Sequence, residues 1–297
     1  MRHLLDVDEL SSGEVESLLA SAETFRRLLD DRLAAPPLLD GRRVALLFAE
    51  PSTRTRLSFE IAARALGAET FVIDPGGSSL VKGESLADTV RTLDALGIDT
   101  LVLRHHRTGA PWVAARHFGG SIVNAGDGWH AHPTQALVDL FTLRRALGDV
   151  AGRKVVIVGD LRHSRVAHSD YMALTTAGAK VTACGPADWL RGWPTEQATD
   201  RLDDALRGAD AVMALRVQRE RMAASLDLDG YIDRYQITEA RMAQAAPGAV
   251  FMHPGPVNEG IEVKHEVAIG PRSLVLEQVR NGVPVRMAVL ARLAGPG

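Results

Sequence analysis

Short runs of apolar residues alternate along the chain with longer segments whose apolar positions recur at helical spacing. One series of runs comprises residues 44–48, 71–73, 101–103 and 122–123, and a second comprises 155–158, 181–183, 211–213 and 250–252. Continuous apolar runs of this length predict strands that are buried on both faces. Intervening helices of 10–15 residues favour right-handed crossovers between parallel strands. The pattern therefore predicts an α/β protein in which each series forms a mostly parallel sheet flanked by helices.

The two series predict two domains. A chain of 297 residues is long for a single core, and the helix predicted at 134–147 joins one series to the other. We place the boundary inside that helix, which gives domains 1–137 and 138–282. A final amphipathic segment, 283–297, predicts a helix that packs back on the first domain, so that two interdomain helices connect the sheets.

Composition and charge narrow the function classes. The net charge of −3 gives no bulk attraction to nucleic acid or an anionic membrane. Cys184 is the only cysteine, which rules out an internal disulfide and a thiolate metal cluster, and its apolar setting indicates a structural thiol in a buried strand. The first residues are acidic where a signal peptide is apolar, and no apolar stretch approaches the ~20 residues of a membrane span. We expect a cytoplasmic protein.

The segment Glu50–Arg56 carries the most specific chemistry. It follows a predicted strand and precedes a predicted helix at 53–66, so Ser52 or Thr53 is expected to cap that helix. Free amides, hydroxyls and a guanidinium at a helix N-terminus form a phosphate site. The alternative is an ordinary N-cap with solvated arginines, but arginines there oppose the helix dipole unless an anion binds.

Two further basic groups follow in the first series. Lys82 lies in a glycine-rich loop beside Ser78 and Ser79, where a lysine is usually just solvated. Arg104 follows the run 101–103 and therefore lies at the carboxyl edge of the predicted sheet, where ligands of such folds bind.

His132 and Gln135 lie three residues apart across a predicted helix start, so both are able to face one pocket. A histidine that donates a hydrogen bond stabilises charge growing on a carbonyl oxygen. A structural role for His132 is the alternative. No second histidine or carboxylate stands at metal-ligand spacing, so no metal is expected.

The second series has basic and turn residues at the ends of its runs. Arg165 and Arg216 each follow a predicted strand and together are able to clamp two carboxylates. The polar stretch from Arg216 to about Gln236 is typical of a flexible flap. The turn 253–256, His-Pro-Gly-Pro, holds backbone carbonyls rigidly. The G-x-G-x-x-G spacing is missing after the strand 155–158, so no dinucleotide cofactor is expected.

Taken together, these motifs resemble the aspartate/ornithine carbamoyltransferase family. Its paired signatures match residues 52–56, Ser-Thr-Arg-Thr-Arg, and 132–135, His-Pro-Thr-Gln. The resemblance runs through essentially the whole chain to the segment 285–290. Residues 82–89, 216–218, 253–256 and 281–283 resemble the aspartate branch, whereas the ornithine branch typically has His-Cys-Leu-Pro in place of 253–256.

The resemblance implies the ligands of both substrates, with no cofactor. The phosphate of carbamoyl phosphate is bound by Ser52, Thr53, Arg54 and Thr55. The carbonyl oxygen is bound by Thr55, Arg104 and His132. The carbamoyl NH2 group is bound by Gln135 and by the backbone of Pro254, Gly255 and Pro256. The two carboxylates of aspartate are bound by Arg165, Arg216 and Gln218. Lys82, with Ser79, resembles loop residues that enter a neighbouring subunit's site, where Lys82 is expected to bind aspartate and to take part in catalysis. This implies a homotrimer with shared sites.

Two positions depart from the family pattern. Glu259 and His168 stand where arginine is common in relatives, and this puts details of domain closure in doubt. Two other functions remain open: a carbamoyltransferase for another amine such as ornithine, and a catalytically silent assembly subunit. The sequence also leaves open whether regulatory chains or other enzymes of pyrimidine synthesis attach.

Overall fold

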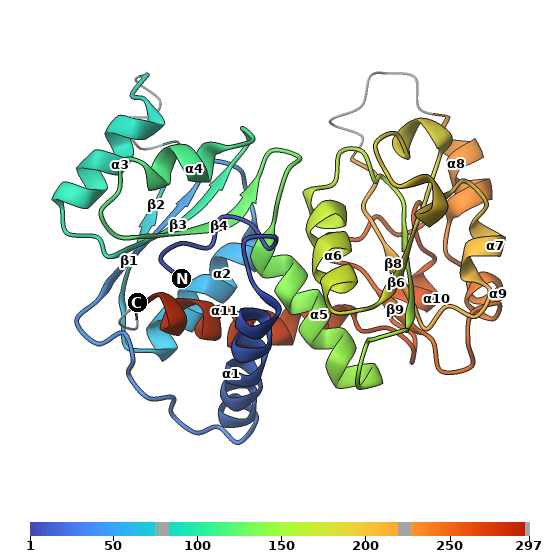
Figure 1. Ribbon diagram of the computed structural model, residues 1–297, viewed down its shortest axis with the longest axis horizontal. Coiled ribbons are helices and arrows are strands. Elements are labelled where there is room, and N and C mark those ends of the chain that lie inside the picture. The colour runs from blue at the N-terminus through green and yellow to red at the C-terminus, as the bar shows by residue number, and fades with distance from the viewer. Residues whose placement is uncertain (75, 77–82, 219–226, 295–297) are drawn as a thin grey trace. The chain divides into compact units, whose positions relative to one another are not determined.

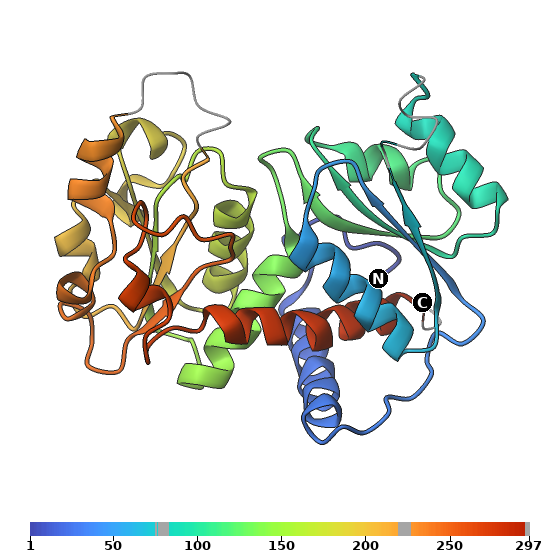
Figure 2. The ribbon, with the colours of Figure 1, turned by 180° about the vertical axis from the view of Figure 1, so that it is seen from behind.

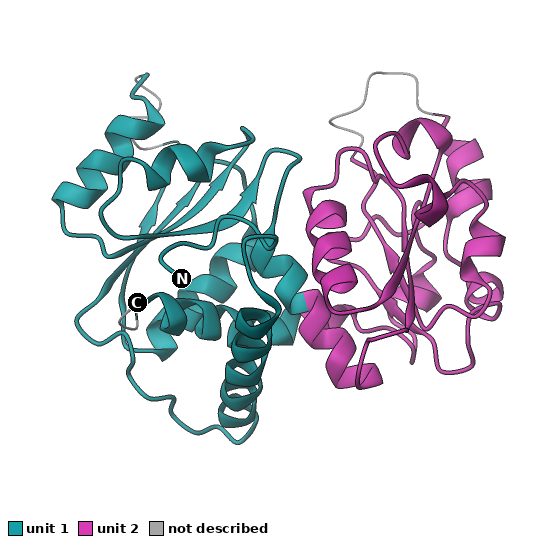
Figure 3. Ribbon diagram, viewed as in Figure 1, with its two compact units in different colours: residues 1–138, 279–297 teal, residues 139–278 magenta. Residues whose placement is uncertain are grey.

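The computed structural model describes residues 1–74, 76, 83–218 and 227–294. The chain divides into two compact units, 1–138 with 279–297 and 139–278 (Figure 3). Ser79 and Lys82 of the predicted loop lie outside the described residues.

Unit 1 is built on a four-stranded parallel sheet in the order β2-β1-β3-β4. Its strands are β1 (Arg43–Phe48), β2 (Glu69–Ile73), β3 (Thr100–His105) and β4 (Ser121–Asp127). Five of the six residues of β1 are buried, as the continuous apolar run predicts for a central strand. β2 is an edge strand, and most of it is exposed.

Helices cover both faces of this sheet (Figures 1 and 2). One face carries α3 (Leu86–Ala95) and α4 (Ala110–Ala115); the other faces α1 (Ser12–Asp30), α2 (Thr53–Ala65) and α11 (Val275–Ala294). Leu47, Leu101 and Leu103 of the sheet pack with Val90 and Leu93 of α3 in one buried cluster. This packing fixes the strand ends from which the candidate residues project.

Unit 2 is built on a second parallel sheet, in the order β7-β6-β5-β8-β9. Its strands are β5 (Lys154–Val158), β6 (Lys180–Cys184), β7 (Ala198–Thr199), β8 (Ala211–Ala214) and β9 (Val250–Met252). Its helices are α6 (Arg165–Thr176), α7 (Leu202–Leu206), α8 (Leu228–Tyr235), α9 (Glu239–Met242) and α10 (His265–Ala268), with 3-10 turns at Ala187–Trp189 and Thr195–Gln197. The helix α5 (Pro133–Leu147) runs from unit 1 into unit 2.

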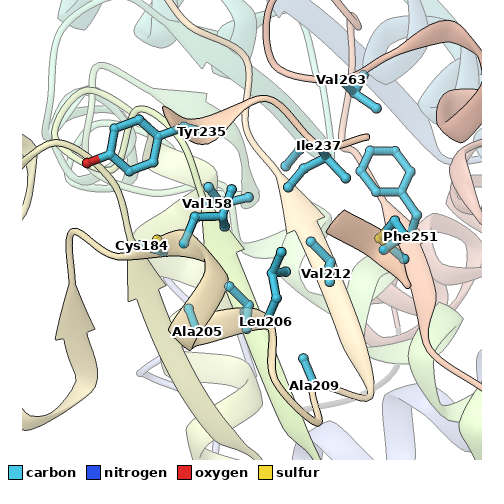
Figure 4. Packing of buried hydrophobic residues seen from close by; sticks show 14 of the residues in the cluster. Val158, Cys184, Ala205, Leu206, Ala209, Val212, Tyr235, Ile237, Phe251 and Val263 are labelled. Carbon is cyan, nitrogen blue, oxygen red and sulfur yellow. The ribbon is translucent and has the colours of Figure 1, made fainter. Parts of the chain in front are cut away.

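The core of unit 2 joins its central strands to the helices that follow them. Val158 and Val212 pack with Leu206, Tyr235 and Phe251 (Figure 4). Cys184 belongs to this cluster, and the prediction of a buried thiol in a strand is confirmed. The predicted α/β class with two parallel sheets is confirmed as well.

Two local predictions are wrong. Residues 219–226 of the stretch predicted as a flap lie outside the described residues. The end of that stretch is not a loop but the helix α8, because Tyr231 and Tyr235, at i and i+4, bury one face of a helix in the core. The last helix was expected at 283–297 but begins at Val275, with Pro284 inside it. The prediction rested on the amphipathic spacing after residue 283. The helix starts earlier because the ring of Pro284 removes a single backbone donor and the helix continues through it.

Candidate active site

The residues expected to bind phosphate lie directly after β1. Ser52 occupies the N-cap position of α2, with extended backbone, but its side chain makes no capping hydrogen bond and the first turn holds no acidic residue. Of the two candidates for the cap, Ser52 or Thr53, the structure places Ser52 at the N-cap position, although the position is held by the backbone and not by the Ser52 hydroxyl. Thr55 is buried and Thr53 is exposed. The positive end of the helix dipole is left without a carboxylate, as an anion site requires.

Arg54 brings a cation to the same helix start. The Arg54 side chain is exposed overall, yet its partly buried setting lowers its pKa. An arginine shifted in this way still remains charged at neutral pH. The backbone around it is held by Ser58, whose hydroxyl donates to the carbonyls of Arg54 (2.7 Å) and Thr55 (3.0 Å).

Arg104 lies near the end of β3, beside β1 in the sheet. Its Nη2 donates to Oε1 of Glu50 over 2.6 Å, and both side chains are largely buried. Sequence reasoning gave Glu50 no role, although it directly precedes the motif. A charge-assisted bond between neighbouring strand ends orients the guanidinium at the edge of the sheet.

Asp127 organises the turn that leads from β4 to His132. This fully buried carboxylate accepts hydrogen bonds from Gly109 N (2.7 Å), Asn124 Nδ2 (2.9 Å) and Ala131 N (3.2 Å). Burial acts to raise its pKa, but the hydrogen bonds from His130, Asn124 and Gly109 outweigh burial and lower it. Nothing in the sequence pattern pointed to this network.

His132 itself is buried, and its carbonyl accepts the N–H groups of Gln135 (2.9 Å) and Ala136 (3.2 Å) at the start of α5. The ends of β1, β3 and β4 are adjacent in the sheet. Unit 1 thus gathers the phosphate and carbonyl candidates, namely Ser52, Thr53, Arg54, Thr55, Arg104, His132 and Gln135, at one edge. A neighbouring imidazole, His105, has its pKa lowered to about 4 by burial and by His106.

In unit 2, the residues expected to bind the carboxylates follow β5 and β8, which are paired in the sheet. Arg165 is the first residue of α6 and is buried, behind a Ser164 cap that accepts Ala167 N. Gln218 donates through Nε2 to the carbonyl of His163 over 3.0 Å. Arg216 is partly buried. The three candidates therefore share the carboxyl edge of the second sheet.

Asp160 ties these two segments together. It accepts the backbone N–H and Nδ1 of His163, at 3.1 and 2.9 Å, and the backbone N–H of Gln218. Burial raises its pKa, against the lowering effect of His163 and of the Gln218 N–H. Sequence reasoning missed Asp160, although it lies only two residues beyond the end of β5.

The turn 253–256 follows β9, next to β8 in the sheet. His253 is buried, and its ring contacts Gly255 N and the carboxylate of Glu262. Of the two departures from the family pattern, Glu259 pairs with His265 over 2.7 Å at the surface, and His168 stacks on Trp193 with ring centroids 5.5 Å apart.

The described part of the chain shows neither a metal-binding cluster nor a membrane-spanning helix. No group of three or more His, Cys, Asp or Glu side chains stands close enough together to hold a metal ion. Among the described residues, no helix combines the length and apolar character needed to cross a membrane.

Fold and site together define a two-unit α/β protein with hydroxyl and basic side chains gathered at the carboxyl edges of both sheets. Two family models match it: the carbamoyl-P binding domain of aspartate/ornithine carbamoyltransferases at residues 2–145, and the Asp/Orn binding domain at 151–293. The chain belongs to the aspartate/ornithine carbamoyltransferase family.

Individual relatives place it more closely. The chain is 50% identical to the aspartate carbamoyltransferase catalytic subunit of Roseiflexus castenholzii, over 99% of this chain and 95% of that one. The aspartate transcarbamoylase of Trypanosoma cruzi, solved with carbamoyl aspartate and phosphate, is similar at a TM-score of 0.86 and 32% identity, covering 98% and 95% of the two chains. The ornithine carbamoyltransferase of Pyrococcus furiosus has a TM-score of 0.86 at 28% identity, covering 98% and 96%. The fold alone does not separate the two acceptors.

Proposed function

We propose that the chain transfers the carbamoyl group of carbamoyl phosphate to the amine of L-aspartate, which gives N-carbamoyl-L-aspartate and phosphate. The observation that carries this proposal is the 50% identity to an aspartate carbamoyltransferase catalytic subunit over 99% of this chain. The arginines at the ends of β5 and β8 support an acceptor with two carboxylates over one with a cationic side chain.

Unit 1 is the proposed carbamoyl-phosphate domain. Ser52, Thr53 and Thr55, with Arg54, bind the phosphate at the start of α2, which the dipole of that helix favours. Arg104, His132 and Thr55 bind the carbonyl oxygen. Gln135 binds the NH2 group together with the Pro254–Gly255–Pro256 backbone of unit 2.

Unit 2 is the proposed aspartate domain. Arg165, Arg216 and Gln218 bind the α- and β-carboxylates, and guanidinium groups match the planar, two-oxygen geometry of a carboxylate. Asp160 supports this arrangement because its contacts to His163 and Gln218 join the two loops. Lys82, which lies outside the described residues, is proposed to complete the site of a neighbouring subunit.

The chemistry is direct displacement at the carbamoyl carbon. The uncharged aspartate amine attacks that carbon, a C–N bond forms, and the carbonyl oxygen gains negative charge in a tetrahedral intermediate. The C–O bond to phosphate then breaks, and the departing phosphate takes the amine proton. Arg54, Arg104 and His132 stabilise the charge on the oxygens, which is the largest contribution expected in acyl transfer. No covalent enzyme intermediate and no cofactor is needed.

The chain is further proposed to act as a cytoplasmic homotrimer in an early step of pyrimidine synthesis. Apolar residues exposed on unit 1 support an assembly: Leu57 and Ile61 lie one turn apart on α2, and Phe71 and Val72 lie on the edge strand β2. Light scattering gives the mass directly, and a monomer at micromolar concentration would contradict the trimer.

Product formation from carbamoyl phosphate with aspartate and, in parallel, ornithine tests the reaction. Carbamoyl-aspartate alone is the expected result. A product only with ornithine would refute the assignment of Arg165 and Arg216. Binding of carbamoyl phosphate without turnover of either amine would instead indicate a silent assembly subunit.

Replacement of Arg54 by Ala tests the donor site. Turnover should fall about 10²–10³-fold, as for loss of one transition-state donor. Arg56→Ala is the matched control, since Arg56 is an exposed arginine of the same helical turn with no assigned ligand. Near-normal turnover of a folded Arg54→Ala protein would show that the donor site is wrongly placed.

Mixing two inactive variants tests whether sites are shared. Lys82→Ala and Arg54→Ala chains, dissociated and reassembled together, should regain activity, because some sites then combine an intact Lys82 with an intact Arg54. A mixture as inactive as its components would refute the shared site.

A further inference from the structure

The turn after β9 presents an unusual set of backbone groups. Of its four residues, Pro254 and Pro256 have no backbone N–H. The N–H of His253 donates to Oε1 of Gln278 over 2.9 Å, and the N–H of Gly255 donates to Nδ1 of His253 over 2.8 Å. Every N–H of the turn is therefore missing or internally bonded. The turn has only carbonyl oxygens to offer a ligand.

The His253 ring is held in one tautomer. Nδ1 accepts the Gly255 N–H, so the proton of the neutral ring is on Nε2. Nε2 faces Oε1 of Glu262 at 3.2 Å, in a position to donate to it. The two side chains are almost fully buried, which strengthens a satisfied hydrogen bond. Oε1 of Glu262 also accepts the N–H of Asn258 at 2.6 Å, which anchors the chain beyond the turn.

The Gln278 amide is oriented in the same way. Its Nε2 donates to Oδ1 of Asp139 over 2.8 Å, and both side chains are buried. A carboxylate accepts hydrogen bonds, so the amide nitrogen faces Asp139 and the amide oxygen faces the N–H of His253. A flipped amide would place donor against donor at His253.

From this geometry we infer that His253 is a positioning residue that makes the Pro254–Gly255–Pro256 turn acceptor-only and so selects a ligand group with N–H donors. The inference rests on the proposed function, in which this turn faces the NH2 of carbamoyl phosphate. A methyl group in place of NH2 gains nothing from such carbonyls. A free Gly255 N–H, in contrast, would repel the NH2 and favour an acceptor.

Acetyl phosphate is the matched probe, because it keeps the phosphate and carbonyl of carbamoyl phosphate and replaces NH2 by methyl. Dissociation constants are measured by calorimetry for carbamoyl phosphate, acetyl phosphate and inorganic phosphate. In His253→Ala, carbamoyl phosphate should bind roughly tenfold more weakly, because the loss of about one hydrogen bond has an effect of that size. Acetyl phosphate and inorganic phosphate should change by less than about twofold, since their contacts lie elsewhere.

Two variants serve as controls for the ring. In His253→Asn, the side-chain oxygen lies near the position of Nδ1 and restores an acceptor for Gly255 N–H, so most of the affinity for carbamoyl phosphate should return. His265→Asn breaks a second His–Glu pair of the same unit, which is exposed, and should leave all three constants unchanged.

Nitrogen NMR of the wild-type protein tests the tautomer without any substitution. The His253 signals should report a proton on Nε2; a proton on Nδ1 would overturn the inference. Equal weakening of all three ligands in His253→Ala, or an unchanged preference for carbamoyl over acetyl phosphate, would overturn it as well. If the wild type makes carbamoyl-aspartate, such results leave the proposed function intact. A wild type that does not bind carbamoyl phosphate refutes both.

Discussion

Replacement of Asp127 is expected to loosen the turn that presents His132. The carboxylate is completely buried and stands between three elements: Gly109 at the start of α4, Asn124 within β4, and Ala131 next to His132. In Asp127→Ala, these three donors and the His130 ring lose this acceptor, and His130 is exposed enough to bond to water instead. Asn124 Nδ2 keeps a second acceptor, the carbonyl of Leu5 at 2.8 Å, so two backbone N–H groups are left unpaired.

The expected loss in the free energy of unfolding follows from the unpaired N–H groups of Gly109 and Ala131. An unsatisfied buried donor costs about 1–3 kcal/mol, so the variant should lose roughly 2–5 kcal/mol, less where water enters the space. Asp127→Asn keeps the volume and one acceptor oxygen and should lose about half as much. Because the native pKa of Asp127 is lowered, the carboxylate contributes stability above about pH 4, and this contribution is lost as the pH falls through the native pKa.

Amide hydrogen exchange measures the loss of local stability at the turn around Asp127. A local cost of about 3 kcal/mol corresponds to roughly 100-fold faster exchange of the Gly109 and Ala131 amides. Peptides from unit 2 serve as an internal reference. Turnover should fall about 10–100-fold, since small displacements of a positioned group are costly. The matched control is Asp94→Ala. Asp94 also accepts a glycine N–H, that of Gly119 at 2.8 Å, but the Asp94 side chain is exposed.

Two results would refute this reasoning. One is exchange at Gly109 and Ala131 in Asp127→Ala no faster than in the Asp94→Ala control. The other is a loss of turnover while both amides stay protected, because Asp127 would then act by some route other than holding the turn.

Three further predictions concern stability and reactivity. Burial raises the pKa of Asp6 to about 6, so the stability contributed by its protonated form is lost as the pH rises through 6. Asp6→Asn should remove this loss, so the urea midpoint of the variant should fall less between pH 5 and pH 7 than that of the wild type. Burial raises the pKa of Cys184 to about 12, so iodoacetamide should label the thiol only in denaturant, and rapid labelling of native protein would contradict the fold. In Gly159→Ala, the new Cβ stands 2.8 Å from the carbonyl oxygen of Leu215 at φ +131°, which should cost about 1–3 kcal/mol and lower Tm; an unchanged Tm would argue against this loop conformation.

The sheets were predictable because their signal is local. The run 44–48 is apolar without alternation and too short for a helix, which favours a strand covered on both faces. Parallel strands also bring their carboxyl ends to one edge, so Arg104 after β3 and His132 after β4 lie at the same edge although they are far apart in sequence. Their pairing at one ligand was implied by the family resemblance. The polar stretch before Gln236 misled the prediction because two tyrosines carry the buried face of a very short helix.

The residues that hold the site in place were not predictable in the same way, and the turn after β9 shows why. Its two prolines remove two backbone donors, a fact visible in the sequence. Its other two donors are removed only by folding, through Nδ1 of His253 and through Gln278, which lies 25 residues beyond the histidine. Which hydrogen bond a buried amide or imidazole makes depends on partners brought together by the tertiary structure. The chemistry of a ligand contact can therefore be visible in a motif while its selectivity depends on residues that the motif does not contain.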